Sequence, residues 1–510
     1  MIEKIFINDF SLYYLMAEYN LASQNPWWLH PDAIELDEHI VRFRKCSVKW
    51  VPRIKYFFDL TCDAIYTVRG PRQVGKTTLV KLMIRELLHK DVRPSRRIFY
   101  WTCDLVEGPK ELVRILEEYI STTRSLTKNR LYIFLDEISA VRDWQRGIKY
   151  LHDTGMLRNT TVIMTGSHSL DIRKAAERLP GRRGEVRGVM DKIFLPMKFS
   201  EYAETRSREV KTLFLQLDLL KTQNRIDLIS ELAEGKLPEK IRILNLHSDL
   251  LSDLFRDYLL TGGMIRALDE YLSEGYIPSD TYSTYVDITI GDILRWDKRE
   301  HYLAQLLRRI FETLCSRVSW NNLRSGTDIG HPNTVVEYVD VLNSSFIVRS
   351  LYQLDRSVGG PRYEKEKKLY IADPFIFHAL RAWVYQLKPF EAANQFISTP
   401  EVSKLVECVV CDHLTRLAFQ MKPTALFDAT RNIFHWRGKK HEVDFILKMN
   451  GEYLPLEVKY KTSIDKSDFQ GLFSFTDFKS RYHGIMITRN ILDVRNDITL
   501  IPAYLFLILI

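Results

Sequence analysis

Short apolar runs alternate with stretches of helical periodicity between Ala64 and about Phe199. Four of these runs have the length and the β-branched and aromatic content of buried strands. They are AIYTVRG, RRIFYWTCDL, RLYIFLDE and NTTVIMTGS. Strands that alternate with helices usually lie parallel in one sheet with helices on both faces, so the pattern predicts an α/β domain with a mostly parallel sheet.

The rest of the chain predicts domains of a different character. The segment WNNLRSGTDIGHPNTVVEYVDVLNSSFIVRSLYQL predicts a helix, a turn with Gly and Pro, a second helix and a strand pair, which is the order of a winged helix. The last part mixes helices with strands, and its apolar end, PAYLFLILI, is predicted to be a final strand. The expected domains are a helical lead-in at 1–60, an α/β domain at 61–200, a helical lid or connector at 201–300, a winged-helix-like domain at 301–385 and a second α/β domain at 386–510.

The first predicted strand runs into a glycine-rich loop that opens a helix, TTLVKLMIRELL. The loop matches the pattern GxxxxGK[ST], in which backbone N–H groups face phosphates, the lysine neutralises the β and γ phosphates, and the hydroxyl reaches Mg²⁺. This context predicts an ATP site with Mg²⁺ as cofactor. The predicted binding residues are Gly70, Pro71, Arg72, Gln73, Val74, Gly75, Lys76, Thr77 and Thr78.

Two further strand ends supply groups that ATP hydrolysis needs. LYIFLDE ends in Asp136 and Glu137, of which one is expected near the metal with Thr77 and the other to orient or activate water. TVIMTGS ends in Ser167 and should place a small hydroxyl beside the γ-phosphate, between the two earlier strand tips. The predicted catalytic residues in these motifs are Lys76, Asp136, Glu137 and Ser167.

The segment LPGRRGEV follows the third of these strand ends by a short helix. Its Arg182 and Arg183 are candidates for an arginine finger that stabilises the transition state on a neighbouring subunit, with Arg182 preferred. A solvated pair of charges is the open alternative. If Arg182 acts in trans, hydrolysis requires a homo-oligomer such as a ring.

Together these motifs resemble a known family. RGPRQVGKTTL, YIFLDEIS with Trp144 downstream, and TGSHSLDIRKAAERLPGRRGEV leading to LPMKFSEY are similar to the prokaryotic and archaeal AAA-like P-loop ATPases, of the AAA+ superfamily, that carry the C-terminal domain DUF4143. YLLTGGM, the helix with Thr334, KLYIADPFIF, EVDFIL and PLEVKY extend the resemblance over most of the chain. It implies an ATPase with Ser167 at the sensor position. The long lead-in and an insertion near 205–250 depart from the shorter members.

The last domain contains a group of acids and a lysine. Asp444 lies on the strand VDFIL, and after a turn the next strand carries Glu457 and Lys459. Alternation puts the latter two on one face, and a hairpin can bring Asp444 beside them, so two carboxylates could hold Mg²⁺ while the lysine activates water. This resembles the PD-(D/E)xK nuclease core, to which Glu407 on the helix before and Gln470 on the helix after are further candidates.

Less demanding interpretations of these C-terminal features stay open. Strand ends often carry salt-bridged Glu and Lys, and the scaffold can serve as a binding module without cleavage. Basic and aromatic groups stand beside the acids, as a nucleic-acid backbone requires, or as a solubilising turn. They include His435, Arg437, Lys439 and Lys440. In the helix-turn-helix, Asn333 and Thr334 could reach a DNA groove and Arg324 a phosphate, whereas winged helices also serve as protein contacts.

Composition limits the class of protein. The chain of 510 residues is 45% hydrophobic and 27% charged, as soluble globular proteins are, and its net charge of +8 permits a polyanionic partner without demonstrating one. It has no apolar run of about 18 residues and no signal-peptide pattern, so we expect a cytoplasmic protein with no membrane partner. The six cysteines are scattered, and the pair Cys408 and Cys411 is expected to pack within a helix rather than bind zinc.

The sequence therefore favours an ATPase that binds DNA and couples ATP turnover to DNA remodelling or translocation, with a nuclease-like domain that binds or cleaves DNA. The alternative is a nucleotide-dependent signalling switch that binds a protein partner. Stimulation of the ATPase by DNA distinguishes the two.

Overall fold

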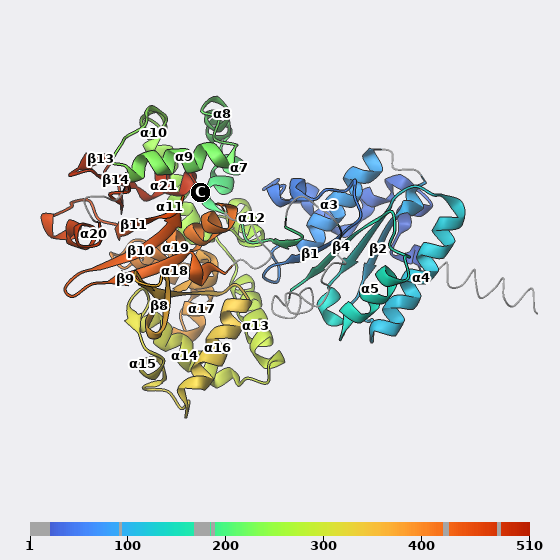
Figure 1. The fold of residues 1–510 in the computed structure, drawn as a ribbon. Helices are drawn as coiled ribbons and strands as arrows, with labels where there is room; N and C mark the ends of the chain where they lie inside the picture. The colour runs from blue at the N-terminus through green and yellow to red at the C-terminus, as the bar shows by residue number, and fades with distance from the viewer. Residues whose placement is uncertain (1–20, 91–93, 168–183, 185–188, 422–427, 477–480) are drawn as a thin grey trace, which may run out of the picture. The chain divides into compact units, whose positions relative to one another are not determined.

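The chain divides into two compact units, Met1–Leu195 and Pro196–Ile510 (Figure 1). The computed structural model describes residues 21–90, 94–167, 184, 189–421, 428–476 and 481–510. Each unit has its own sheet, five-stranded in the first and nine-stranded in the second.

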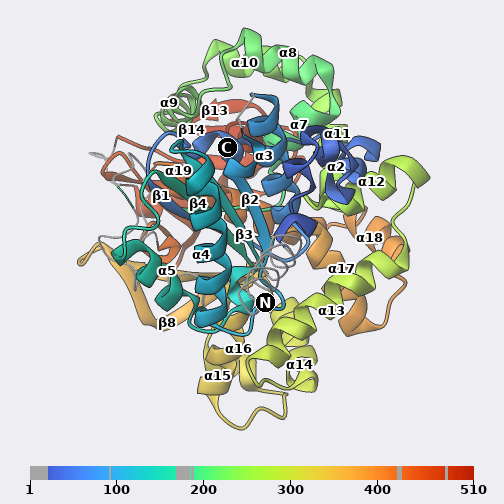
Figure 2. The same cartoon turned by 90° about the vertical axis from the view of Figure 1, so that its right-hand side faces the viewer.

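The sheet of the first unit is parallel throughout, in the order β2-β3-β4-β1-β5. Its strands are β1 (Ala64–Arg69), β2 (Ile98–Thr102), β3 (Leu131–Asp136), β4 (Thr160–Gly166) and β5 (Asp191–Ile193). Its helices are α2 (Glu38–Lys45), α3 (Lys76–His89), α4 (Pro109–Leu126) and α5 (Trp144–Asp153). Figure 1 shows α3 on one face of the sheet and α4 and α5 on the other, and in Figure 2 α4 lies in front of the strands. The predicted α/β class is confirmed, and β4 lies between β3 and β1 as the sequence predicts.

The segment before β1 covers the edge of this sheet at β2. Asn25 Nδ2 donates to the Tyr100 carbonyl at 3.0 Å, and the Tyr100 N–H donates to Asn25 Oδ1 at 2.7 Å, so one side chain pairs with the edge as a neighbouring strand would. The indoles of Trp27 and Trp28 both donate to the Ile98 carbonyl, at 3.0 and 2.9 Å. Satisfying these backbone groups keeps the edge from pairing with another chain.

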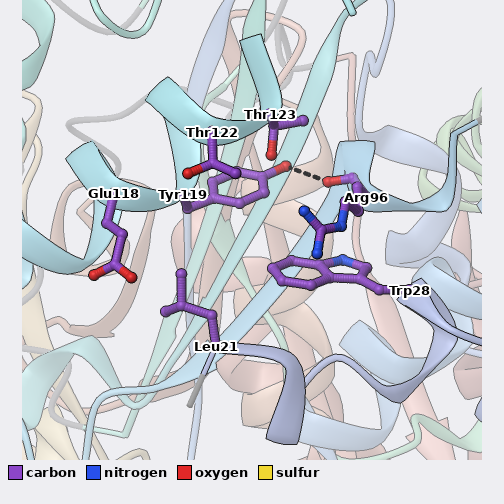
Figure 3. A pocket seen from close by; sticks show the side chains of 7 residues that line it. All are labelled: Leu21, Trp28, Arg96, Glu118, Tyr119, Thr122 and Thr123. Atoms are coloured by element: carbon purple, nitrogen blue, oxygen red, sulfur yellow. Dashed lines mark hydrogen bonds between the residues drawn. The ribbon is translucent and has the colours of Figure 1, made fainter. Parts of the chain in front are cut away.

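The same segment packs its rings against α4. Trp28 stacks on Tyr119 with ring centroids 5.9 Å apart, and the Arg96 guanidinium lies 5.3 Å from the Trp28 ring. Figure 3 shows the small pocket between them, with the Tyr119 hydroxyl donating to the Arg96 carbonyl at 2.9 Å. The described part of the predicted lead-in thus forms short helices that lie at the β2 edge and against α3. They are the 3₁₀ helices η1 (Pro26–Trp28), η2 (Pro31–Leu36) and η3 (Arg53–Phe57), with α2 between the last two.

The second unit begins with helices and continues into a mixed sheet in the order β13-β14-β12-β11-β10-β9-β7-β8-β6. The helices before the first strand are α7 (Phe199–Arg206), α8 (Arg208–Gln216), α9 (Thr222–Ala233), α10 (Glu239–Asn245), α11 (Ser248–Thr261), α12 (Ile265–Glu274), α13 (Ser279–Arg295) and α14 (Glu300–Glu312). The winged-helix order follows in β6 (Arg317–Val318), α15 (Trp320–Arg324), α16 (Pro332–Ser344), β7 (Val348–Asp355) and β8 (Gly360–Ile371). Figure 1 shows this segment beside the strands of the last part of the chain.

The last part contains the strands that the sequence predicts at β9 (Ile433–Arg437), β10 (Glu442–Met449), β11 (Glu452–Lys459) and β12 (Ile485–Thr488). The remaining strands are β13 (Asp493–Arg495) and β14 (Ile498–Pro502), and the helices are α17 (Pro374–Tyr385), α18 (Pro389–Ile397), α19 (Val402–Met421), α20 (Gln470–Phe475) and α21 (Ala503–Ile508). Strands β7 and β9 share one residue pair, Gln353 with His435, so the winged-helix strands and the last strands form one sheet through a narrow junction.

The prediction for the apolar end of the chain is wrong. Its strand, β14, stops at Pro502, and the run from Ala503 to Ile508 forms the helix α21. Every residue of α21 is buried, so the run has no polar face from which a period could be recognised. In the part of the chain that the structure describes, no helix combines the length and apolarity needed to cross a bilayer.

Removing the side chain that pairs with the β2 edge should destabilise the first unit. In Asn25→Ala the buried backbone groups of Tyr100 lose both partners, and we expect unfolding to become easier by about 1–3 kcal/mol. Urea unfolding of the first unit measures this. The matched control is Leu29→Ala, because Leu29 is 74% exposed and its removal should change stability by less than about 0.5 kcal/mol. Equal midpoints for the two variants would contradict the role of Asn25.

Candidate functional site

The loop between β1 and α3 has the backbone that its sequence predicts. Gly75 precedes α3 with φ +101°, a left-handed conformation that favours glycine. A Cβ at Gly70 would lie 1.9 Å from the Phe194 carbonyl oxygen, so only glycine fits there. The Lys76 ammonium is buried under the loop and donates to the carbonyls of Gly70 and Pro71, at 3.0 and 2.9 Å.

The Asp136 carboxylate lies at the end of β3 and accepts hydrogen bonds from three hydroxyls. Thr77 Oγ1, at the start of α3, donates to Oδ2 at 2.6 Å, and the Tyr100 hydroxyl of β2 donates to the same oxygen at 3.1 Å. Thr165 Oγ1 of β4 donates to Oδ1. The two residues expected at the metal, Thr77 and Asp136, are therefore in direct contact.

Glu137 follows with a left-handed backbone, φ +50°, and its carboxylate turns toward the end of β4. Ser139 Oγ donates to Oε1 at 2.7 Å, the Ser167 N–H to the same oxygen at 3.1 Å, and Ser167 Oγ to Oε2 at 3.0 Å. Burial raises the pKa of Glu137, but these hydrogen bonds and the charge of Lys76 outweigh burial and lower it below its usual value. Glu137 is therefore an ionised carboxylate at neutral pH, held beside the P-loop lysine.

Sequence reasoning missed the contributions of β2 and of the N-terminal segment. Tyr100 belongs to no motif, and only the parallel order β2-β3 brings its hydroxyl to Asp136. Asp37 forms an ion pair with Lys81 of α3 at 3.0 Å, and His39 Nδ1 lies 3.5 Å from the Thr78 hydroxyl. The segment before β1 thus packs on the helix that begins the predicted ATP site. Arg182 and Arg183, the arginine-finger candidates, lie outside the described residues.

The acids and the lysine that the sequence predicts in the last domain lie close together in the structure. We call this group the C-terminal centre; it consists of Glu407, Asp444, Glu457 and Lys459. Antiparallel pairing of β10 with β11 brings Asp444 beside Glu457, whose Oε2 accepts the Asp444 N–H at 3.2 Å. Lys459 Nζ lies 2.5 Å from Glu457 Oε1. Glu407, on α19, accepts a hydrogen bond from the Tyr370 hydroxyl of β8 at 3.0 Å. The other candidate, Gln470, begins α20 and is exposed.

Lys368 of β8 stands among these acids and was not predicted. Its Nζ lies 2.8 Å from Asp444 Oδ1, 3.8 Å from Glu407 Oε1 and 3.9 Å from Glu442 Oε1, and its side chain is 2% exposed. Nothing in the run KEKK distinguishes this lysine, because the β8 residues that face the centre are set by sheet geometry. Among the described residues, no three His, Cys, Asp or Glu side chains are arranged to hold a metal ion.

The charges of this centre shift the pKa values of its acids in opposite directions. Burial and then the charge of Asp444 raise the pKa of Glu407 to about 8 and that of Glu457 to about 7. Burial also acts to raise the pKa of Asp444, but the charges of Lys368 and Lys459 outweigh it and lower that pKa below its usual value. At neutral pH, Asp444 is therefore ionised, whereas Glu407 keeps its proton.

The remaining candidates lie on the surface or in the core. Asn333 is exposed at the start of α16, but the same helix also exposes Glu337 and Asp340. Thr334 and Arg324 are half-buried. Of the basic residues near the C-terminal centre, His435 is buried, and the Arg437 guanidinium lies 3.7 Å from Glu442 Oε2. Lys439 and Lys440 are exposed. Cys408 and Cys411 are buried free thiols on α19.

The raised pKa of Glu407 makes the stability of the second unit depend on pH. The folded chain keeps a proton up to about pH 8 that the unfolded chain releases near 4.5, so stability falls as pH rises between these values, by up to about 1.4 kcal/mol per pH unit. Glu407→Gln cannot lose this proton, and we expect its stability to fall less than that of the parent between pH 5.5 and 8. Urea midpoints of both proteins at pH 5.5 and at pH 8 measure the difference. An equal change in midpoint for the parent and for Glu407→Gln would contradict the raised pKa of Glu407.

Comparison with known proteins agrees with the first unit's geometry. Family models match at residues 63–203 (an AAA domain), 252–387 (a domain of unknown function, DUF8612) and 402–506 (a domain of unknown function, DUF4143). An uncharacterised protein of Methanocaldococcus jannaschii is 25% identical over 292 residues, which are 56% of this chain and 55% of that protein. The chain thus spans about half the length of this relative.

Two solved structures of archaeal proteins are also similar. A Walker-type ATPase of Pyrococcus abyssi has 15% identity and a TM-score of 0.37, covering 62% of this chain and 91% of its own. The Aeropyrum pernix Orc1 protein in complex with DNA has 14% identity and a TM-score of 0.28, covering 72% of this chain and 97% of its own. The AAA match lies on the parallel sheet and its glycine-rich loop. The model of the AAA domain thus matches residues 63–203, and the model of the DUF4143 domain matches residues 402–506 of the same chain.

Proposed function

We propose that the first unit hydrolyses ATP with Mg²⁺ at the carboxyl ends of β1, β3 and β4. The observation that carries this proposal is the contact between Thr77 and Asp136, with Glu137 held next to it by Ser167. A hydroxyl and a carboxylate in contact at the start of a P-loop helix are suited to hold Mg²⁺, which when bound would neutralise charge on the β and γ phosphates. The backbone of residues 70–77 and Thr78 would hold the phosphates.

Each residue of this site then has a separate task. Lys76 exchanges its two backbone carbonyl partners for phosphate oxygens, and its buried position keeps the charge close to them. Glu137, ionised and fixed by two serines, orients and deprotonates the attacking water. Ser167 links the γ-phosphate position to Glu137. Arg182 of a neighbouring copy would complete the charge around the transition state in a homo-oligomer.

The ATPase proposal predicts that changes at different residues affect ATP binding and ATP hydrolysis differently. Lys76→Ala should abolish ATP turnover and weaken ATP binding, whereas Glu137→Gln should bind ATP as the parent does and turn it over roughly a hundredfold more slowly. Steady-state phosphate release and nucleotide titration measure the two quantities. Lys90→Ala is the matched control, because Lys90 follows the same helix and is exposed. Undiminished turnover in Lys76→Ala would exclude this site.

We further propose DNA as the partner of the second unit, with ATP turnover coupled to its remodelling or translocation. The exposed basic turn at Lys439 and Lys440 supports a DNA contact. The exposed acids of α16, Glu337 and Asp340, would repel phosphates, so we assign the contact to the basic turn rather than to this helix.

The same acids favour a second candidate function. Glu337 is paired with Lys298, and Asp340 faces solvent on the next turn of α16. A helix with this charge is better suited to a basic protein surface than to a DNA groove. In this case the protein is a nucleotide-dependent signalling switch, and the second unit receives a protein partner.

Turnover with and without DNA distinguishes these candidates. If DNA is the partner, duplex, single-stranded or branched DNA should stimulate the ATPase of the parent. The double change Lys439→Ala with Lys440→Ala should weaken DNA binding and reduce the slope of the logarithm of the binding constant against the logarithm of the salt concentration by about 2. The control is Lys221→Ala, whose lysine is 71% exposed on the helical part of the same unit. Slow turnover that no DNA changes would contradict the DNA proposal and favour the switch.

A further inference from the structure

The C-terminal centre contains its own cation. The Lys368 ammonium is buried, contacts Asp444 Oδ1 at 2.8 Å, and lies within 4 Å of carboxylate oxygens of Glu407 and Glu442. Burial acts to lower the pKa of Lys368, but the charge of Asp444 and the hydrogen bond to it outweigh burial, so the pKa lies above its usual value and the side chain stays charged. A permanent positive charge therefore lies where a nuclease-like centre would hold a divalent ion.

Carboxylate oxygens of Asp444, Glu457 and Glu407 also accept hydrogen bonds from other donors of the chain. Asp444 Oδ2 accepts the Val458 N–H at 3.1 Å, and Glu457 accepts Lys459 Nζ on one oxygen and the Asp444 N–H on the other. Glu407 Oε1 accepts the Tyr370 hydroxyl. An ion entering here would have to displace these donors and to approach an ammonium group at short range, so the residues do not fit a Mg²⁺ site.

The strand that carries Lys368 comes from the winged-helix segment. Acids on β10 and α19 bind this lysine, although among the described residues the backbone pairing between the winged-helix strands and the last strands is the single pair Gln353 with His435. Tyr370, two residues along β8 on the same face, adds its hydrogen bond to Glu407. The side chains of β8 therefore hold together two parts of the sheet that share little backbone pairing.

We propose that Lys368 takes the place of the divalent cation in this centre, and that the centre is a metal-free ion-pair core that fastens the winged-helix segment to the DUF4143 domain. The second unit then binds its partner and does not cleave it by metal-dependent chemistry. This inference does not depend on the ATPase of the first unit, and its test uses no nucleotide.

Calorimetric titration of the nucleotide-free full chain with Mn²⁺ tests the proposal. We expect the parent and Asp444→Asn to give the same isotherm, because Asp444 holds no ion in the parent. We expect Lys368→Ala to gain one Mn²⁺ site that the parent lacks, and Lys368→Ala with Asp444→Asn to lose it again. Lys365→Ala, an exposed lysine of the same strand, should behave as the parent.

Two results of the titration would overturn the proposal. One is a Mn²⁺ site in the parent that Asp444→Asn abolishes, and the other is a folded Lys368→Ala that gains no site. If Lys368→Ala does not fold, the comparison of the parent with Asp444→Asn still decides whether the centre binds metal. Cleavage of plasmid DNA with Mn²⁺ is an independent measurement, and cleavage by the parent that Asp444→Asn removes would also overturn it.

Discussion

The buried carboxylate of Asp136 is the point on which the first unit depends. It accepts hydrogen bonds from hydroxyls at the start of α3, on β2 and on β4. Because Asp136 itself ends β3, one carboxylate connects three neighbouring strands and the P-loop helix. The parallel order β2-β3-β4-β1 makes this possible, because parallel strands end at the same edge of the sheet. Displacing any of these elements would leave a buried carboxylate with an unfilled acceptor, which costs about 1–3 kcal/mol.

The N-terminal segment extends this arrangement to the edge of the sheet. Strand β2, which carries Tyr100, is an edge strand, and Asn25 pairs with the backbone of that same residue. The position of the Tyr100 hydroxyl at Asp136 is therefore fixed from outside the sheet as well as from within it. Asp37 holds Lys81 on the P-loop helix. A segment without a recognisable motif thus helps to place two parts of the predicted ATP site.

Sequence reasoning placed residues as the structure has them where those residues form a local pattern. The glycine-rich loop, the acids at the end of β3 and the alternation of Glu457 with Lys459 are all short-range features, and their neighbours in the structure follow from strand direction. It failed where a residue reaches its partners only through the pairing of strands that are far apart in the sequence. Tyr100 and Lys368 lie on strands whose partners are far away in sequence, and α21 is buried on every side, so its period carries no signal. A single sequence does not reveal such contacts.

The two acidic centres of the chain differ in the charge of what surrounds them. The hydrogen-bond donors to Asp136 are neutral hydroxyls, which stabilise its negative charge without cancelling it. The donor to Asp444 at 2.8 Å is an ammonium group from Lys368, and a second lysine pairs with the adjacent Glu457. An added cation would meet neutral donors at the first carboxylate and ammonium groups beside the second. Both centres place a buried aspartate at a strand of a sheet, and in our proposals the charge of the neighbouring donor decides which of them can recruit a metal ion.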